Sequence, residues 1–256
     1  MKKKTNIKMA STLLALSILL TATSCSLKDK GNTKEKEELP RTTTEEEYDS
    51  NNIEEKNNNE TIEENNNNII EINNFAYLIC DTPLYDEELN EIDYIDKYQK
   101  VSIIKENNNM TYVSYYRGVN DIEFGYIPID SYEILPSLFV EVDISDQIVN
   151  MYIDKEVLLT TDTVTGKTST PTREGYFGIT YKDYDTYLRG SDYCSHVDYW
   201  MPFDGGIGLH DADWRDTFGG DIYINDGSHG CVNLPKEAAK TIYENVEAGS
   251  KVLVHK

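Results

Sequence analysis

The residues best suited to covalent chemistry lie near the end of the sequence, where a cysteine follows a glycine and two histidines precede it. Cys231 stands in the stretch Ser228-His229-Gly230-Cys231-Val232-Asn233, and residues 211–227 separate His210 from Ser228. A cysteine attacks only as its thiolate, so it needs a base or a cation within hydrogen-bond reach. His210 can supply that base. The pair therefore predicts a thiol nucleophile activated by an imidazole.

This pattern resembles the signature of the L,D-transpeptidase catalytic domain. That signature is a histidine, a spacer, and then Ser or Thr, His, Gly, Cys, a hydrophobic residue and Asn, and every fixed position is filled here. The likeness extends over roughly residues 139–255, because residues 170–177 match the family's upstream Thr-Pro element and residues 199–203 match its active-site cover. The motif is strongly specific.

The resemblance implies a role for each residue of the pair. Cys231 would attack a peptide carbonyl and become a thioester, and His210 would be the general base. The tautomer of His210 would be fixed by an acceptor on its other ring nitrogen, which in the family is the backbone carbonyl of the next residue, here Asp211. The Asp211 carboxylate is a competing acceptor. No cofactor or metal is expected, because a thioester conserves the energy of the bond that it replaces.

The developing oxyanion needs donors that are placed in advance, and the backbone amides of Gly230 and Cys231 are the expected ones, since glycine lets the chain approach closely. Ser228, His229 and Asn233 would shape this loop or contact substrate. For Asn233 the alternative is a hydrogen bond within the loop or at the start of the following helix.

The resemblance also implies the substrate. The enzyme would take the third-residue carbonyl of a peptidoglycan tetrapeptide stem, expel the terminal D-residue, and pass the acyl group to a side-chain amine of a neighbouring stem. Carbapenems would acylate Cys231. Residues 182–206 are rich in aromatics and would cover the cleft, with Tyr199 and Trp200 in contact with substrate and Arg189 as a possible cation; several of these rings could instead pack against the core.

Other readings remain open. Water could replace the acceptor amine, which would make an L,D-carboxypeptidase or endopeptidase with the same active-site residues. A non-catalytic wall-binding protein is a third class. A metal site from His196, His210, His229 and Cys231 has usable ligand types but lacks a short paired ligand module. A papain-like hydrolase is set aside because its cysteine would precede its histidine.

The elements that would position this site are mainly β. Alternating strands are expected over 139–144 and 147–153 as a hairpin with one buried face, and over 157–164, while residues 236–246 read as a helix with Pro235 in its first turn and Gly249 at its end. We expect a β-sandwich of the L,D-transpeptidase type over residues 137–256, with one or more supporting helices.

Residues 75–136 form a separate expected domain. Short strand-like runs at 75–79, 100–105, 111–116 and 125–129 predict a small β-barrel. It resembles a bacterial SH3-like domain at residues 82–85 and 124–128. The clustered Tyr112, Tyr115 and Tyr116 are expected to pack in its core, with a wall-peptide groove as the alternative.

The N-terminus indicates export. Residues 1–25 combine lysines, an apolar run and Ala22-Thr23-Ser24-Cys25, which resembles a lipobox whose cleavage would leave a lipid on Cys25. An ordinary signal peptide with an incidental cysteine is the alternative. Residues 26–74 are dominated by Asn, Glu, Lys and Thr and are expected to be a disordered tether. The expected location is the outer face of the cell membrane, in the cell-wall space.

The net charge and the cysteine content limit which partners and which disulfide bridges are expected. The 24 Lys and Arg residues against 46 Asp and Glu give a net charge of −22, which disfavours nucleic acid as a partner. We expect a monomer. With Cys25 and Cys231 assigned, Cys80 and Cys194 remain, and either a bridge between them or two free thiols fits the sequence.

Overall fold

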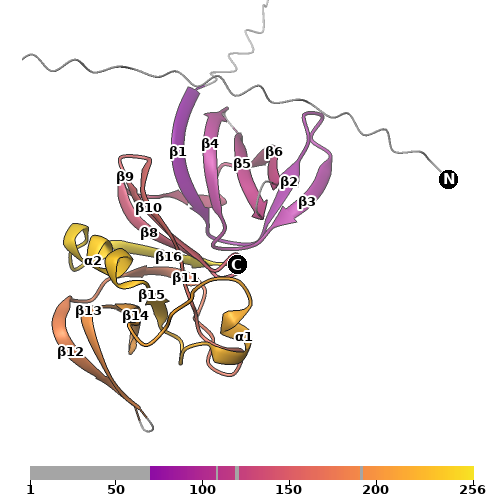
Figure 1. Cartoon of the computed structure of the whole chain (residues 1–256). Coiled ribbons are helices and arrows are strands. Elements are labelled where there is room, and N and C mark those ends of the chain that lie inside the picture. Colours follow the sequence, from indigo (N-terminus) through magenta and orange to yellow (C-terminus); the bar gives the residue numbers. More distant parts are fainter. Residues whose placement is uncertain (1–69, 108, 119–120, 191–192) are drawn as a thin grey trace, which may run out of the picture. The chain divides into compact units, whose positions relative to one another are not determined.

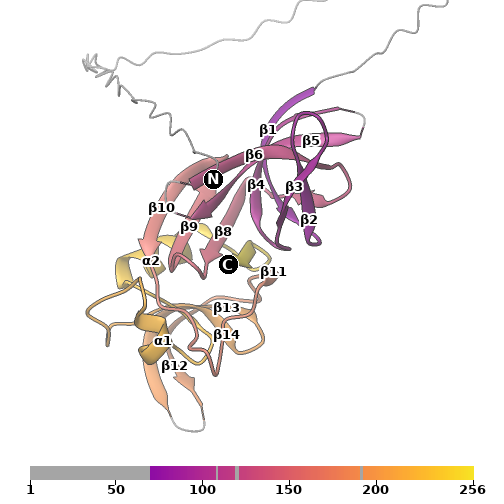
Figure 2. The same cartoon turned by 90° about the vertical axis from the view of Figure 1, so that its right-hand side faces the viewer.

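The computed structural model describes residues 70–107, 109–118, 121–190 and 193–256, and within these residues the strands form three sheets (Figures 1 and 2). The first contains β1 (Ile70–Leu78), β2 (Thr82–Tyr85), β3 (Glu91–Ile95), β4 (Lys100–Glu106), β5 (Met110–Gly118), β6 (Asp121–Pro128) and β7 (Tyr132–Ile134). The second contains β8 (Leu138–Asp143), β9 (Ile148–Ile153), β10 (Glu156–Asp162), β11 (Gly175–Gly178) and β16 (Lys251–His255). The third contains β12 (Asp183–Arg189), β13 (Cys194–Asp204), β14 (Ile207–Asp211) and β15 (Val232–Leu234). The helices are α1 (Ile222–Asp226) and α2 (Lys236–Asn245).

The first sheet is antiparallel, in the order β3-β2-β6-β5-β4-β1-β7, and it has a hydrophobic core of its own. Of the three clustered tyrosines, Tyr115 is buried in this core as expected. Tyr112 is half-buried, where its ring stacks on Phe124 and lies at a tilt to Tyr126, and Tyr116 is 54% exposed. Only one of the three therefore packs inside.

Strand β1 begins earlier than the sequence predicted. Ile70 and Glu71 already pair with Glu106 and Lys105 of β4, although residues 70–74 were assigned to the tether. A bulge between Glu71 and Asn74 interrupts the register, with Asn73 at φ 44°. The local sequence is rich in Asn, which hides the strand, and pairing with β4 overrides that weak local preference.

The second and third sheets share one core, which confirms the mainly β, sandwich-like prediction. In the second sheet the order is β10-β9-β8-β16-β11, with β8 and β16 parallel, and in the third it is β12-β13-β14-β15. Side chains of both sheets meet in one cluster with Ala239, Ile242 and Val246, which are contributed by α2 and the residue after it. Helix α2 was predicted within one residue of its end, but Gly249 belongs to a turn beyond it, where its amide donates to the carbonyl of Ile179.

Strand β8 is buried on both faces, and the predicted hairpin with a single buried face was wrong in this respect. Val140 and Val142 face the shared core. The alternate positions Phe139 and Glu141 face the first sheet, where Phe139 packs with Tyr77 and Leu135. A residue alternation alone cannot show that a second sheet covers the other face.

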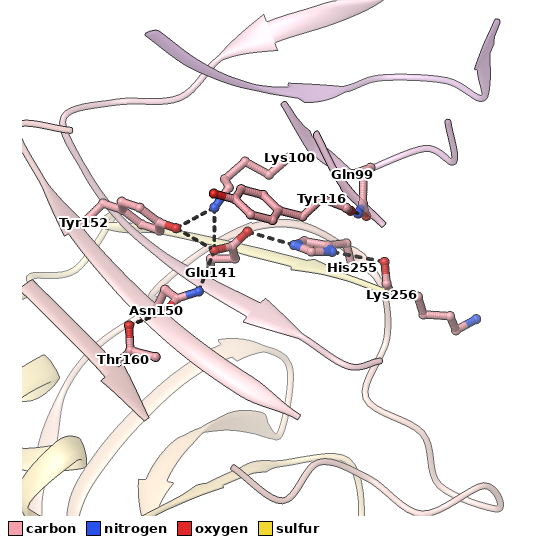
Figure 3. Close-up of polar contacts among 9 residues, drawn as sticks. All are labelled: Gln99, Lys100, Tyr116, Glu141, Asn150, Tyr152, Thr160, His255 and Lys256. Carbon is pink, nitrogen blue, oxygen red and sulfur yellow. Dashed lines mark hydrogen bonds and ion pairs between the residues drawn. The ribbon is translucent and has the colours of Figure 1, made fainter. Parts of the chain in front are cut away.

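Glu141 is the centre of a buried polar cluster on that face (Figure 3). Its Oε2 accepts from Lys100 Nζ at 2.8 Å, from the Tyr152 hydroxyl at 3.0 Å and from Asn150 Nδ2 at 3.0 Å, and its Oε1 lies 3.0 Å from His255 Nε2. Burial alone would raise the pKa of Glu141, but Lys100 and His255 hold it well below its usual range. Burial likewise opposes the charge on His255, yet the Glu141 carboxylate leaves the His255 pKa raised. Lys100 of β4 and Glu141 of β8 thus form a buried ion pair that joins two sheets.

Several sequence predictions fall on residues 1–69, outside the described part of the chain: the signal segment, the lipidated Cys25 and most of the tether. Within the described residues, no helix has the length and apolar character needed to cross a membrane. Cys80, Cys194 and Cys231 are free thiols, so the structure does not contain the bridge between Cys80 and Cys194.

Candidate active site

Two neighbouring parallel strands bring His210 and Cys231 together. His210 of β14 pairs with Asn233 of β15, and Cys231 lies two positions before Asn233. Side chains two apart along extended chain point to the same face, so Cys231 and Asn233 share the face of the sheet on which His210 lies. Both members of the predicted pair line one cavity of about 230 Å³.

His210 is held as a neutral base. Its Nδ1–H donates to the backbone carbonyl of Asp211 at 2.7 Å, as the resemblance implied, which leaves Nε2 as the basic nitrogen. The rings of Trp200 and Trp214 each lie 5.8 Å from the imidazole. Burial lowers the pKa of His210. The imidazole is therefore uncharged and ready to take a proton at neutral pH.

The Asp211 carboxylate is not the acceptor for His210. It accepts from the backbone amides of Asp198, at 3.2 Å, and Tyr199, at 2.7 Å. The side chain of Asp211 is thus directed to β13, and it fixes the neighbouring strand rather than the imidazole. Only its backbone carbonyl takes part in the predicted arrangement.

Cys231 is half-buried and protonated in the resting site. Burial raises the pKa of its thiol, and its Sγ contacts the carbonyl of Gly206 at 3.7 Å in the β13–β14 turn. Within the described residues Sγ makes no hydrogen bond to His210. Catalytic hydrogen bonds are commonly long in the unliganded state and tighten when substrate binds, so a shared cavity is the relevant observation.

The loop before Cys231 is braced from within and from outside. Ser228 Oγ donates to the carbonyl of Cys231 and accepts from the Gly230 amide at 3.0 Å. Thr172 Oγ1 donates to the carbonyl of Gly230 at 2.8 Å, and Thr170 Oγ1 donates to that of Ser228 at 2.9 Å. Gly230 has φ +118°, a conformation that side chains rarely adopt.

One of the two expected oxyanion donors is thereby engaged. The Gly230 amide is bonded to Ser228 Oγ, so it does not point freely into the site as the sequence analysis expected. Gly230 serves the loop through its backbone conformation. The amide of Cys231 remains the candidate donor of the pair.

The cavity wall contains more residues than the motif identified. It is formed by Leu188, Tyr193, Ser195, His210, Trp214, Arg215, Asp226, Gly227, Ser228, His229, Cys231 and Asn233. His229 is exposed, and its ring stacks on that of Tyr193 at 5.1 Å. Asn233 is buried with its Oδ1 unpartnered, and α2 has no side-chain cap, so Asn233 does not cap that helix.

Comparison with known proteins identifies this part of the chain. The family model for the L,D-transpeptidase catalytic domain matches residues 137–254. The catalytic domain of Enterococcus faecium L,D-transpeptidase, solved by NMR, is 43% identical over 46% of this chain and 96% of that one, with a TM-score of 0.44. Residues 137–254 belong to the L,D-transpeptidase family.

Two further solved structures resemble this chain. The same E. faecium domain acylated by ertapenem is 42% identical over 47% of this chain and 98% of that one, with a TM-score of 0.45. The crystal structure of a Cys-to-Ser mutant of E. faecium L,D-transpeptidase is 42% identical over 47% of this chain, with a TM-score of 0.46. The match spans half the length of that crystallised chain. No protein among curated sequences matches.

The predicted cover of the L,D-transpeptidase cleft is a hairpin of β12 and β13, from which Leu188, Tyr193 and Ser195 reach the cavity. Tyr199 and Trp200, the two expected contacts, do not line it. Tyr199 packs on Tyr243 of α2. Trp200 is buried, with its ring centre 5.8 Å from that of His210.

Arg189 also lies away from the cavity, where it contacts Cys194 Sγ at 3.3 Å and lies over the Tyr187 ring. Arg215 is the one Lys or Arg among the described residues that line the cavity. Trp214 and Arg215 follow His210 closely in the sequence, which is the one sign that they could lie near the site. The fold shows that the chain turns back to the cavity at these residues.

The four ligands of the alternative metal site are not gathered. His196 lies on the hairpin, where its Nε2 contacts Asp185 at 2.6 Å and Asp198 at 3.9 Å. Among the described residues, these three are the ones whose ligand atoms lie close enough for a metal ion, and Lys236 already pairs with Asp198. His196 is therefore separate from the thiol and from His210.

Proposed function

We propose that this protein is a peptidoglycan L,D-transpeptidase that joins stem peptides through a thioester on Cys231. The single observation that carries the proposal is the placement of His210 and Cys231 on one face of adjacent strands, lining one cavity, with His210 Nδ1 fixed by the Asp211 carbonyl. Family membership supports the substrate class.

The chemistry follows from the neutral pair. As Sγ attacks the carbonyl carbon of the third stem residue, the thiol proton passes to His210 Nε2. The tetrahedral oxyanion is held by the Cys231 amide. When the C–N bond breaks, the imidazolium returns the proton to the departing D-residue amine. An acceptor amine then attacks the thioester, His210 takes its proton, and the thiol leaves protonated.

The test uses the intact chain with a disaccharide tetrapeptide and analyses adducts and products by mass spectrometry. The proposal requires a thioester at Cys231, release of one D-residue, and cross-linked dimers. Trimmed monomers without dimers would mean an L,D-carboxypeptidase or endopeptidase. Binding without any thioester would mean a wall-binding scaffold.

Matched cysteine variants sharpen that test. Cys231→Ala should form neither adduct nor dimer. Cys80→Ser changes an exposed thiol in the turn between β1 and β2 and should retain both. Because an E. faecium relative has been solved as an ertapenem adduct, we also expect a carbapenem to add to Cys231 of this chain and not to the alanine variant.

We further propose that the protein acts at the outer face of the membrane, anchored by a lipid on Cys25, and that residues 75–136 form an SH3-like module that spaces or docks the enzyme. The N-terminal sequence pattern supports the anchor. Fatty-acid labelling that persists in Cys25→Ser would refute it.

A further inference from the structure

Arg215 is a buried cation in the active-site wall. It lies in the turn after β14, where its amide donates to the Ala212 carbonyl at 2.9 Å. Its side chain is 9% exposed and lines the same cavity as Cys231. Its Nη1 donates to the Asp226 carboxylate at 2.8 Å, and its Nη2 donates to the Asp226 backbone carbonyl at 2.6 Å.

Asp226 leaves one edge of the guanidinium unused. The group carries five N–H donors in a fixed plane, and the bonds to Asp226 occupy the edge formed by the two terminal nitrogens. Arg215 Nε is buried and has no partner among the described residues. A buried donor without a partner is unfavourable, so this position favours a ligand. The edge formed by Nε and Nη2 has the spacing that binds a carboxylate through two parallel hydrogen bonds.

The charge around the cavity points to the same kind of ligand. The chain has a net charge of −22, yet Arg215 is the one Lys or Arg among the described residues that line the cavity. Asp226 is the one acidic residue in the same set, and its side chain is 81% exposed. A cation buried beside the nucleophile of an acidic protein favours an anionic group on the substrate.

Asn233 supplies the complementary group. Its Oδ1 is the other buried side-chain atom without a partner in the described residues, and Asn233 pairs with His210 across the two strands. Arg215 Nε is therefore an unpaired donor and Asn233 Oδ1 an unpaired acceptor, on two residues that line the same cavity as His210 and Cys231. The last residue of a peptide presents the matching pair, an amide N–H and a terminal carboxylate.

We propose that Arg215 binds the α-carboxylate of the C-terminal residue that the donor stem loses, so that the enzyme selects stems ending one residue beyond the scissile bond. This inference rests on the proposed transpeptidase function. Arg215 is then a specificity-determining residue. It holds the leaving residue while the C–N bond breaks, and it forms or breaks no covalent bond itself.

The first experiment needs no variant. The intact chain is given a tetrapeptide donor with a free terminal carboxylate, the same donor as its terminal carboxamide, and the pentapeptide, and kcat/KM is measured for release of the leaving group. We expect the carboxylate donor to be favoured over the carboxamide by about 10- to 100-fold, the worth of a charge-assisted pair of hydrogen bonds. Equal rates on the two would overturn the proposal.

Variants then assign the preference to Arg215. In Arg215→Gln the ratio of carboxylate to carboxamide rates should fall to about one, and Arg215→Lys, which keeps the charge but lacks the fork, should lie between. Arg117→Gln removes an arginine that pairs with Asp93 and Glu123 in the first sheet, and it should keep the native ratio. The ratio is internal to each preparation, so a partly unfolded variant does not distort it.

The outcomes separate the two proposals. A native ratio that persists in Arg215→Gln shows that another group reads the carboxylate, and the inference about Arg215 is then wrong while the transpeptidase function stands. Inactivity of the unaltered chain on every donor would refute the proposed function, and the inference would fail with it.

Discussion

At the proposed catalytic pair, Cys231 and His210, burial acts on both residues in the direction that keeps them uncharged. It raises the pKa of the Cys231 thiol and lowers that of His210. Sγ contacts the carbonyl of Gly206, and a backbone hydrogen bond from Gly208 lowers the pKa of the thiol but does not outweigh the effect of burial. In the proposed mechanism the thiolate of Cys231 therefore forms during attack, when substrate excludes water and brings the proton acceptor within reach.

The first prediction concerns the pH dependence of acylation. Because the pKa of His210 is lowered, the base form persists below the ordinary imidazole pKa of about 6.5, and the acid limb of the rate profile should lie below that value. Trp214→Ala removes a ring that shields the imidazole, so the pKa of His210 should rise and the acid limb should move to higher pH. The measurement is the second-order rate of carbapenem acylation against pH. An acid limb above about 6.5 in the unaltered chain would contradict the neutral pair.

The sequence singled out Cys231 and His210, which the fold places in the wall of one cavity, but it did not single out Trp214 or Arg215 in the same wall. The pair is recognisable because its residue types and spacing carry the chemistry themselves. Trp214 and Arg215 enter the site only because the chain turns back after β14, and that turn is held by the amide of Arg215 on Ala212. Tyr199 failed as a prediction because aromatic content does not tell which face of a strand meets a cavity.

At the scale of elements, the loop before Cys231 is held in place by residues 166–172, which lie far from it in the chain. Thr172 is buried, and its hydroxyl accepts from the Gly166 amide at 2.9 Å while donating to the Gly230 carbonyl. Gly166 itself has no room for a side chain, since a Cβ there would lie 2.9 Å from Gly230 Cα. The position of Cys231 is therefore set by packing between two loops.

The second prediction tests that brace. Thr172→Val keeps the shape of the side chain but leaves the Gly166 amide and the Gly230 carbonyl without their partner, which should cost about 1–3 kcal/mol of unfolding free energy. Displacement of the loop should also slow carbapenem acylation about tenfold. Thr160→Val is the matched control, because Thr160 is exposed and its hydroxyl bonds only Asn150. Urea unfolding and acylation rates that are alike in the two variants would show that the brace is dispensable.

The strands with alternating apolar residues were predictable, and those without were not. Residues of β8, β9 and α2 show the periods of their elements, and their bounds were close to those observed. Strand β12 is mostly exposed, and its sequence is rich in Tyr and Asp. It therefore shows no alternation of apolar and polar residues, and the sequence analysis did not predict a strand there. Strand β15 has three buried residues and is defined by its parallel pairing with β14, which no local pattern reveals.

At the scale of the molecule, the first sheet packs against the catalytic part. It covers one face of β8, through the aromatic cluster around Phe139 and through Lys100, which pairs with Glu141. The side chains of Lys100 and Glu141 are 10% and 5% exposed, and the carboxylate has a donor at each oxygen. A carboxylate so deeply buried is tolerable only with such partners.

The last prediction is that the catalytic part loses stability when Lys100 is neutralised. Lys100→Met leaves Glu141 buried with fewer compensating donors, and removing one partner of a buried ion pair costs about 3–5 kcal/mol. Lys240→Met removes a lysine from an exposed pair with Glu244 on α2 and should change stability by less than about 1 kcal/mol. Urea unfolding followed by the fluorescence of Trp200 and Trp214, which both lie beside His210, reports on the catalytic part. Equal unfolding midpoints for the two variants would mean that the first sheet lies against β8 without stabilising it.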